Sequence, residues 1–360
     1  MKHTDVRSWL LSISDFRRSQ VKTLSFLVYA AMATARVSLA ELGRTMARQH
    51  GQSAKHCIKR VDRFLGNSRV EPGIAMSGWI RWVARPGRRL LISMDWVDIR
   101  QWHCLVLAAR LRGRAIPLLW ASYRHEELFR SQNNLEYGLL RLLRCHLPDK
   151  ADVVILADRG FGRTEMAREC QKLRFGYIIR ITPDVWVDHS EFRGKLLDLP
   201  IRRGTQRMLR NVAYRKSSPV TQHVAILWLP AEDQPWFLMT NLPKLRAKRL
   251  SRIYGRRMTI EEYFRDCKSK RNGYALRLTM IQDQKRLERL LLILAVAYWL
   301  LLAVGLYATK TYPPSRWCTN RRPGECSLFT IGRFIFPLPL PAIRNLLDDL
   351  RREACLANWG

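Results

Sequence analysis

The chain has 360 residues, enough for two or three domains with a hydrophobic core, and its hydrophobic fraction of 47% is ordinary for a globular protein. Its charge is not ordinary, because 63 basic and 30 acidic residues give a formal net charge of +33. So basic a chain repels itself unless a polyanion neutralises it, which argues against a function without a polyanionic partner. Nucleic acid is the expected partner, and an anionic membrane surface is the lesser alternative.

Residues 1–85 predict a helical DNA-binding domain, with a first helix over Asp15–Thr34. Ser38, with Glu41 three residues later, is typical of a capping box. The helix that it opens is separated by a short Gly-containing connection from a second helix, about Ser53–Leu65. The pair fits a helix-turn-helix, and an ordinary helical hairpin with a solvated basic face is the alternative. The basic residues on or near the exposed face of the second helix are Lys55, Lys59, Arg60 and Arg63.

A connector is predicted over residues 71–89, because Pro72 and Gly87 are helix breakers. After it the patterns predict three strands, a helix, a strand, a helix and a strand, over Leu90–Asp95, Trp102–Ala109, Ala115–Ala121, Ser131–Leu147, Asp152–Asp158, Thr164–Leu173 and Tyr177–Ile181. Two of these strands end in an aspartate. A mixed α/β fold is therefore expected.

The pattern changes between residues 182 and 244 to short alternating runs, which predict a β-rich insertion. The runs are Gln206–Ala213, Val220–Leu229 and Trp236–Thr240. A strongly basic segment, residues 244–257, connects this insertion to the next helix.

That helix is predicted over Tyr254–Lys268, and its periodicity sorts its residues onto two stripes. At roughly 100° per residue, four polar or amphipathic residues lie within an arc about 60° wide: Tyr254, Arg257, Glu261 and Lys268. A second, apolar stripe is expected to pack against the protein and holds Ile253, Ile260, Phe264 and Cys267. One carboxylate is thus presented among cations, and weak surface ion pairs are the alternative reading.

The segment Leu290–Leu306 is apolar throughout and almost long enough to span a bilayer. A single membrane anchor is the alternative, but a helix that is apolar on all sides is expected to be buried, against the sheet that bears the two aspartates. Residues 311–360 predict a proline-rich connector and a last helix, about Ala342–Leu356.

The eight cysteines are scattered, with no C-x-x-C pair, and the chain opens with no secretory signal. Cys318 and Cys326 lack the second pair that would complete a zinc site. This usage argues against a disulfide framework and predicts reduced thiols in a cytoplasmic protein.

Three acids are the candidate catalytic residues: Asp95, Asp158 and Glu261. Carboxylates at strand ends point into the crevice where α/β sheets place their sites. Three converging acids repel one another, and a divalent cation removes that cost. Oxygen ligands suit Mg²⁺ or Mn²⁺, and two ions bridging a phosphate suit phosphodiester chemistry. Asp98 is a competitor of Asp95, but it lies three residues later and so faces the opposite side of a strand.

The spacing Y-x2-R-x3-E-x6-K over Tyr254–Lys268 resembles the signature of bacterial cut-and-paste insertion-sequence transposases. ADRGFGR around Asp158 is similar to the second-Asp motif of that family, whereas Val97 departs from the small or hydroxyl residue of many members. The resemblance implies a ribonuclease H-like catalytic domain over residues 86–310, with the insertion at 182–244. In that family the three acids form a DDE triad that binds two Mg²⁺ ions, with Mn²⁺ as the substitute.

The resemblance also implies a reaction: water attacks the DNA at a transposon end, and the freed 3′-OH attacks the opposite strand or the target. Tyr254, Arg257 and Lys268 are implied DNA contacts. In hairpin-forming members a Trp at the place of Trp236 stacks a flipped base, and a packing Trp is the alternative.

The implied partners are double-stranded DNA and a second copy of the chain in a synaptic dimer, with no membrane. The implied location is the bacterial cytoplasm, at the nucleoid. The alternative functions are a nuclease of the same fold without strand transfer, a catalytically inert DNA-binding regulator, and a membrane-anchored basic protein.

Overall fold

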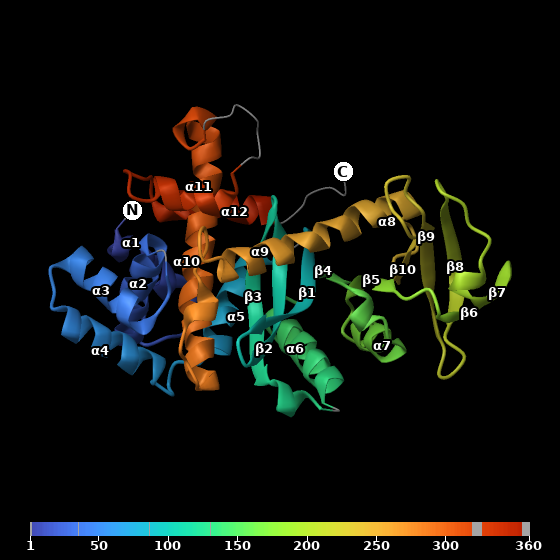
Figure 1. The fold of residues 1–360 in the computed structure, drawn as a ribbon, viewed down its shortest axis with the longest axis horizontal. Helices are drawn as coiled ribbons and strands as arrows, with labels where there is room; N and C mark the ends of the chain where they lie inside the picture. The colour runs from blue at the N-terminus through green and yellow to red at the C-terminus, as the bar shows by residue number, and fades with distance from the viewer. Residues whose placement is uncertain (1, 35, 86, 130, 319–325, 355–360) are drawn as a thin grey trace.

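The computed structural model describes the whole chain except residues 1, 35, 86, 130, 319–325 and 355–360. Ten strands form one sheet in the order β3-β2-β1-β4-β5-β10-β9-β8-β6-β7. Figure 1 shows the N-terminal helices and the long helix α10 at the β3 end of this sheet and the late strands at the other end. The fold is therefore mixed α/β with a large sheet, consistent with a ribonuclease H-like domain.

The half of the sheet nearest the N-terminal helices has the predicted order of elements. Its strands are β1 (Arg89–Ile99), β2 (Trp102–Leu111), β3 (Arg114–Arg124), β4 (Asp152–Ala157) and β5 (Gly176–Ile181). The connecting helices are α6 (Gln132–His146) and α7 (Thr164–Lys172). β1 pairs antiparallel with β2 and parallel with β4. One expectation is wrong: β1 does not end at Asp95 but continues to Ile99, because β2 remains paired with it as far as Trp102.

Residues 182–244 are rich in strands, as predicted, and these strands extend the same sheet. They are β6 (Trp186–His189), β7 (Phe192–Lys195), β8 (Gln206–Tyr214), β9 (Val220–Leu227) and β10 (Trp236–Thr240). β10 pairs antiparallel with β5, which makes the join between the two halves. The late strands are therefore joined to the first half of the sheet through β5, which lies next to β4.

The predicted helix Tyr254–Lys268 is divided into three pieces. Helix α8 (Ala247–Tyr254) is followed by the 3-10 turn η4 (Gly255–Met258) and then by α9 (Thr259–Lys268). The expectation of one regular helix is therefore wrong at its first turn. The apolar stripe is confirmed, since Ile253, Ile260, Phe264 and Cys267 are all buried.

The N-terminal segment is helical, as predicted, with two differences. Its helices are α1 (His3–Ile13), α2 (Arg18–Ala33), α3 (Leu39–His50), α4 (Ala54–Leu65) and α5 (Pro72–Val83). The first was not predicted, and the last occupies the expected connector, because Pro72 takes the first helical position, where its missing N–H costs nothing. Ser38 caps α3 by accepting the N–H of Glu41 at 3.1 Å, but the Glu41 side chain pairs with Arg44 and Arg48 instead of closing the box.

Helix α10 (Gln284–Thr311) contains the long apolar segment and is the only described helix long and apolar enough to cross a membrane. Its most apolar window is 94% buried within the protein. The neighbours that surround it are β3, α2, α4, α5, α11 (Leu328–Ile335) and α12 (Ile343–Ala354). The expected burial of α10 is confirmed. However, α10 meets the sheet at the edge strand β3, and helices cover the rest of its surface.

Two glycines let α10 and α11 approach closely. A Cβ atom at Gly305 would lie 2.0 Å from the carbonyl oxygen of Leu328, and one at Gly332 would lie 1.9 Å from that of Leu301.

The N-terminal helices share this core, so residues 1–85 pack on α10 rather than standing apart.

Candidate active site

Asp95 and Asp158 lie side by side on two parallel strands. The last paired residues of β1 and β4 are Met94 and Ala157, so the two aspartates are the next residues in register. Asp95 is still within β1, whereas Asp158 comes directly after β4. The Asp158 carboxylate accepts a hydrogen bond of 2.8 Å from the N–H of Gly160. This bond caps the 3-10 turn η2 (Arg159–Phe161) and fixes the carboxylate at the end of β4.

Glu261 is carried to the same place by α9, which packs on the face of the sheet to which Asp95 points. Phe264 and Cys267 of α9 line one small cavity with Val97, two residues beyond Asp95 on the same face of β1. Figure 1 shows α9 on one side of β1–β3 and α6 on the other. Burial of the apolar stripe therefore orients the helix so that Glu261 faces the two aspartates.

Arg257 joins two of the three acids. Its Nη1 lies 3.1 Å from Oδ2 of Asp95, and its Nη2 lies 2.6 Å from Oε1 of Glu261. The side chain of Arg257 is only 10% exposed and that of Asp95 17%, so this ion pair is screened little by solvent, whereas Glu261 is 43% exposed. The 3-10 turn η4 places Arg257 at this position.

The electrostatics identify a shared carboxylate site. Burial raises the pKa of Asp95 to about 6; Arg257 opposes this rise, and Asp158 and Glu261 add to it. The pKa of Arg257 is raised, since Tyr254, Asp95 and Glu261 outweigh the effect of its burial. Three mutually repelling carboxylates with oxygen donors fit a hard divalent cation such as Mg²⁺ or Mn²⁺.

The remaining members of the Y-R-E-K pattern lie around this site in different ways. Tyr254 is 4% exposed, so it supports Arg257, which lies 6.0 Å from its ring centre, rather than facing solvent. Lys268 is half-buried, and its pKa is lowered. Burial and the nearby charge of Arg277 cause this shift, and the opposing effects of Asp98 and Asp95 are smaller. Lys268 and Glu261 line an open cleft of about 500 Å³ with Phe264, Arg265, Ser269 and Arg277.

Trp236 lies at the start of β10, and the residues on either side of it, but not Trp236 itself, line a second cavity. Its ring packs edge-on against Tyr254, with centres 5.7 Å apart, and the Arg180 guanidinium lies 5.1 Å above it. The neighbouring residues Pro235 and Phe237, together with Arg180 and Arg159, line a cavity of about 490 Å³. Sequence analysis did not single out Arg159 or Arg180; the position of Arg159 directly after Asp158 was the available signal.

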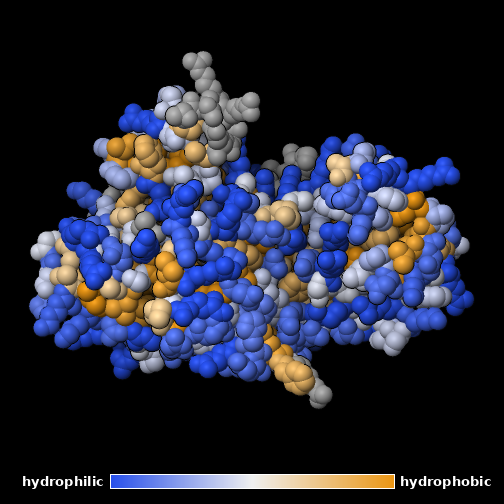
Figure 2. Space-filling model, viewed as in Figure 1, coloured by the Kyte–Doolittle hydropathy of each residue, from blue (hydrophilic) through white to orange (hydrophobic). Residues whose placement is uncertain are grey.

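The basic residues of α4 lie elsewhere, among the N-terminal helices. Lys55, Lys59 and Arg63 are exposed, and Arg60 is partly buried. A Cβ atom at Gly43 of α3 would lie 2.5 Å from Ile58, so glycine there permits the close crossing of α3 and α4. Figure 2 shows hydrophilic residues over much of the visible face of the molecule.

Free cysteines among the described residues are Cys57, Cys104, Cys145, Cys170 and Cys267. Cys355 lies outside the described residues.

A search of curated proteins finds no match. Residues 132–300 match the family model of the transposase DDE domain. The matched segment contains Asp158 and Glu261 and begins after Asp95. Together with the carboxylate site, this match supports a DDE transposase acting on DNA.

Proposed function

We propose that this protein cuts DNA at the ends of its own mobile element and joins those ends to a target. The observation that carries the proposal is the convergence of the three acids: Arg257 joins Asp95 to Glu261, and Asp158 lies beside Asp95 on the neighbouring strand. A regulator that only binds DNA has no need of three partly buried acidic residues whose mutual repulsion must be offset. The family match points to the same chemistry.

Asp95, Asp158 and Glu261 are the residues that would hold the divalent ions. When bound, two such ions activate the attacking oxygen and stabilise the leaving oxygen of a phosphodiester. The protein residues fix the separation of the three carboxylates, because β1, β4 and α9 are each packed into one core. This rigidity favours a single geometry for the scissile phosphate.

Arg257 and Lys268 would hold the DNA backbone on either side of Glu261. A guanidinium is suited to bidentate phosphate contact, and Arg257 is already held by two carboxylates and by Tyr254. Lys268 lines the open cleft next to Glu261, where a phosphate of the bound strand would enter. The basic segment before α9 adds affinity that depends on salt but not on sequence.

Trp236 would stack a base turned out of the duplex during hairpin formation, and Arg180, which lies over its ring, also lines the cavity next to it. The cavity combines apolar walls, such as Leu197 and Trp228, with the two guanidinium groups of Arg159 and Arg180. This combination suits a stacked base and its phosphate. Trp236 adjoins Tyr254, which lies next to Arg257, so Trp236 and the carboxylates would serve one strand end.

End recognition would use α3 and α4 as a helix-turn-helix, with Lys55, Lys59 and Arg63 exposed on α4. Cutting two ends in one synapse calls for a dimer. The protein would act in the bacterial cytoplasm, on the nucleoid.

The test uses full-length protein, a supercoiled plasmid carrying the two ends of the element, and a second plasmid as target. With Mg²⁺ we expect nicks at the ends, then release of the element, then joined products. Cleavage without joining would favour the nuclease of the same fold. Binding of the ends with no cleavage in Mg²⁺ or Mn²⁺ would contradict the proposal and favour the inert regulator.

A further inference from the structure

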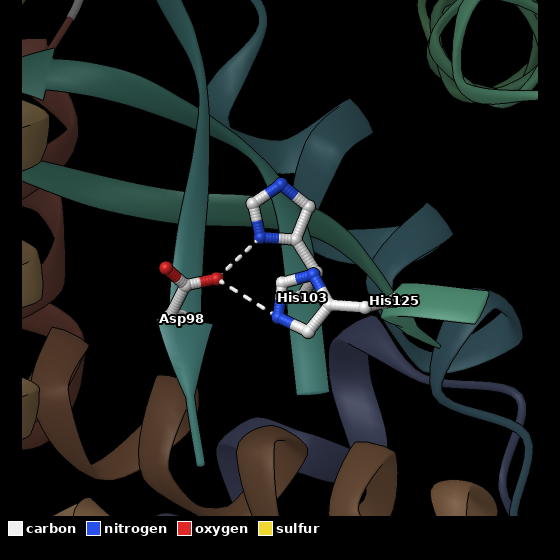
Figure 3. Close-up of side chains that lie close together, drawn as sticks. All are labelled: Asp98, His103 and His125. Atoms are coloured by element: carbon white, nitrogen blue, oxygen red, sulfur yellow. Dashed lines mark hydrogen bonds and ion pairs between the residues drawn. The ribbon is translucent and has the colours of Figure 1, made fainter. Parts of the chain in front are cut away.

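Two histidines and an aspartate gather beyond the carboxylate site, on the other face of the sheet. Trp96, which shares a face of β1 with Asp98, donates its indole N–H to Glu136 of α6, whereas Val97 packs against α9 on the opposite face. Asp98 therefore points away from Asp95. Figure 3 shows the imidazoles of His103 and His125 turned toward the Asp98 carboxylate.

Strand pairing brings these residues together. Asp98 on β1 is the register partner of His103 on β2. His103 is in turn the partner of Tyr123 on β3, and His125 comes two residues later, on the same side, at the start of the 3-10 turn η1 (His125–Leu128). The three side chains thus come from three consecutive segments whose register is fixed by the sheet.

The donor atoms lie near the spacing of a metal site. Oδ1 of Asp98 lies 2.5 Å from Nδ1 of His103 and 3.6 Å from Nε2 of His125. One donor atom from each residue lies within 4.8 Å of the other two. Zinc binds such donors at about 2.0–2.2 Å, which holds them about 3–3.5 Å apart, so small side-chain rotations suffice to enclose an ion.

Neighbouring residues already orient one of the imidazoles. The ring of His103 stacks on Trp96 with centres 4.6 Å apart and planes 4° apart. Trp96 is held by its hydrogen bond of 3.0 Å to Glu136, which also pairs with Arg163. Asp98 and His125 are 59% and 57% exposed, so an ion with its water can enter. A pre-oriented ligand beside two accessible ones is an arrangement that metal sites use.

We propose that Asp98, His103 and His125 form a second metal site, specific for a divalent transition metal of the Zn²⁺ class. Two imidazoles and one carboxylate suit Zn²⁺, Co²⁺ or Ni²⁺ and disfavour Mg²⁺, which prefers oxygen ligands. Asp98 lies three residues from Asp95, or about 10 Å along the strand. An ion there would clamp the ends of β1 and β2 to the segment after β3, and so stiffen the strand that carries Asp95.

The test is Zn²⁺ binding by full-length protein, measured by competition with a chromophoric chelator. All variants carry Cys145→Ser, which removes the thiol that is exposed in the described part of the chain. His125→Gln and Asp98→Asn test the site, His56→Gln on exposed α4 is the matched control, and Glu261→Gln tests independence from the carboxylate site. Zinc X-ray absorption spectra report the ligand atoms directly.

We expect one Zn²⁺ per chain, imidazole scattering in the spectrum, and a loss of affinity of at least 10–100-fold in His125→Gln and Asp98→Asn. The His56→Gln and Glu261→Gln proteins should bind as tightly as the parent. Equal affinity in His125→Gln and His56→Gln would overturn the proposal, as would sulfur ligation or loss of the ion in Glu261→Gln alone.

Discussion

Nη1 of Arg257 lies 3.1 Å from the Asp95 carboxylate, so a cation from the turn before α9 already neutralises one acid of the candidate active site. The other end of the same guanidinium reaches Glu261 at 2.6 Å. Arg257 therefore links the helix that carries Glu261 to the strand that carries Asp95, and its loss affects both charge balance and geometry.

Replacement of Arg257 by Ala should lower the thermal stability of the protein most at high pH. The variant leaves the Asp95 carboxylate, 17% exposed, without this partner, and losing a hydrogen bond to a charged group costs about 1.5–3 kcal/mol. Below pH 5 the protonated Asp95 no longer needs the partner, so the deficit should shrink. Unfolding in EDTA at pH 5 and pH 8 measures it. Arg252→Ala, exposed on α8, is the control, and an equal deficit at both pH values would refute the electrostatic cause.

Binding of Mn²⁺ in the absence of DNA should weaken as the pH falls below about 6. Burial raises the pKa of Asp95 to about 6, so below that value the ion competes with a proton, and the affinity should drop by up to tenfold per pH unit. Titration of free Mn²⁺ by electron paramagnetic resonance between pH 7.5 and 5 measures this. Asp95→Asn should bind weakly with a flat pH dependence; a flat profile in the parent protein would remove Asp95 from the ligands.

The raised pKa of Asp95 has the opposite effect on the stability of the metal-free protein, which should fall as the pH rises. A carboxyl group whose pKa is raised from 3.8 to about 6 on folding stabilises the protein fully below pH 4. That contribution is lost as the pH rises toward and through 6. In EDTA, Asp95→Asn should therefore gain stability relative to the parent across this interval, and constant stability relative to the parent from pH 4 to 7 would contradict the assignment.

Trp236→Ala should slow hairpin formation by about one to two decades while sparing the first nick. Stacking an extruded base on an aromatic ring is worth roughly 1–3 kcal/mol, and the first nick needs no extruded base. Trp236→Phe should be intermediate, because a smaller ring still stacks. Trp186→Ala, in β6 of the same insertion, is the control. Equal loss of both steps in a folded Trp236→Ala protein would make Trp236 a packing residue.

Charge reversal at Lys55, Lys59 and Arg63 should weaken DNA binding and flatten its salt dependence. Each lost phosphate contact reduces the slope of log K against log salt by about one. Binding of full-length protein is measured, since the N-terminal helices share a core with α10. Reversal of Arg193 on β7 is the control. An unchanged slope in the α4 variant would place end recognition elsewhere.

The elements that could be predicted are those whose signals are local in sequence. Strands β1 to β5 followed from apolar runs, and the stripe that orients Glu261 followed from helical periodicity. The 3-10 turn at Arg257 could not be predicted, because a tertiary ion pair to Asp95 holds it. The extension of β1 to Ile99 depends on its partner Trp102, and the cavity next to Trp236 depends on residues from segments as far apart as Arg159 and Phe237. Pairing between distant segments leaves no periodic trace in the chain.

The central claim, that Glu261 completes a metal-dependent catalytic triad, is tested most directly by comparing Glu261→Gln with Glu262→Gln. The two glutamates are adjacent on α9, but Glu262 pairs with Arg114 and Arg265 rather than with Arg257. The measurement is the single-turnover rate of Mg²⁺-dependent cleavage of element-end DNA, with end binding and melting temperature recorded in parallel. We predict that Glu261→Gln loses at least about 10²–10³-fold in rate while binding the ends within a few-fold, and that Glu262→Gln cleaves near the parental rate. Cleavage by a folded Glu261→Gln protein at the parental rate would contradict the account.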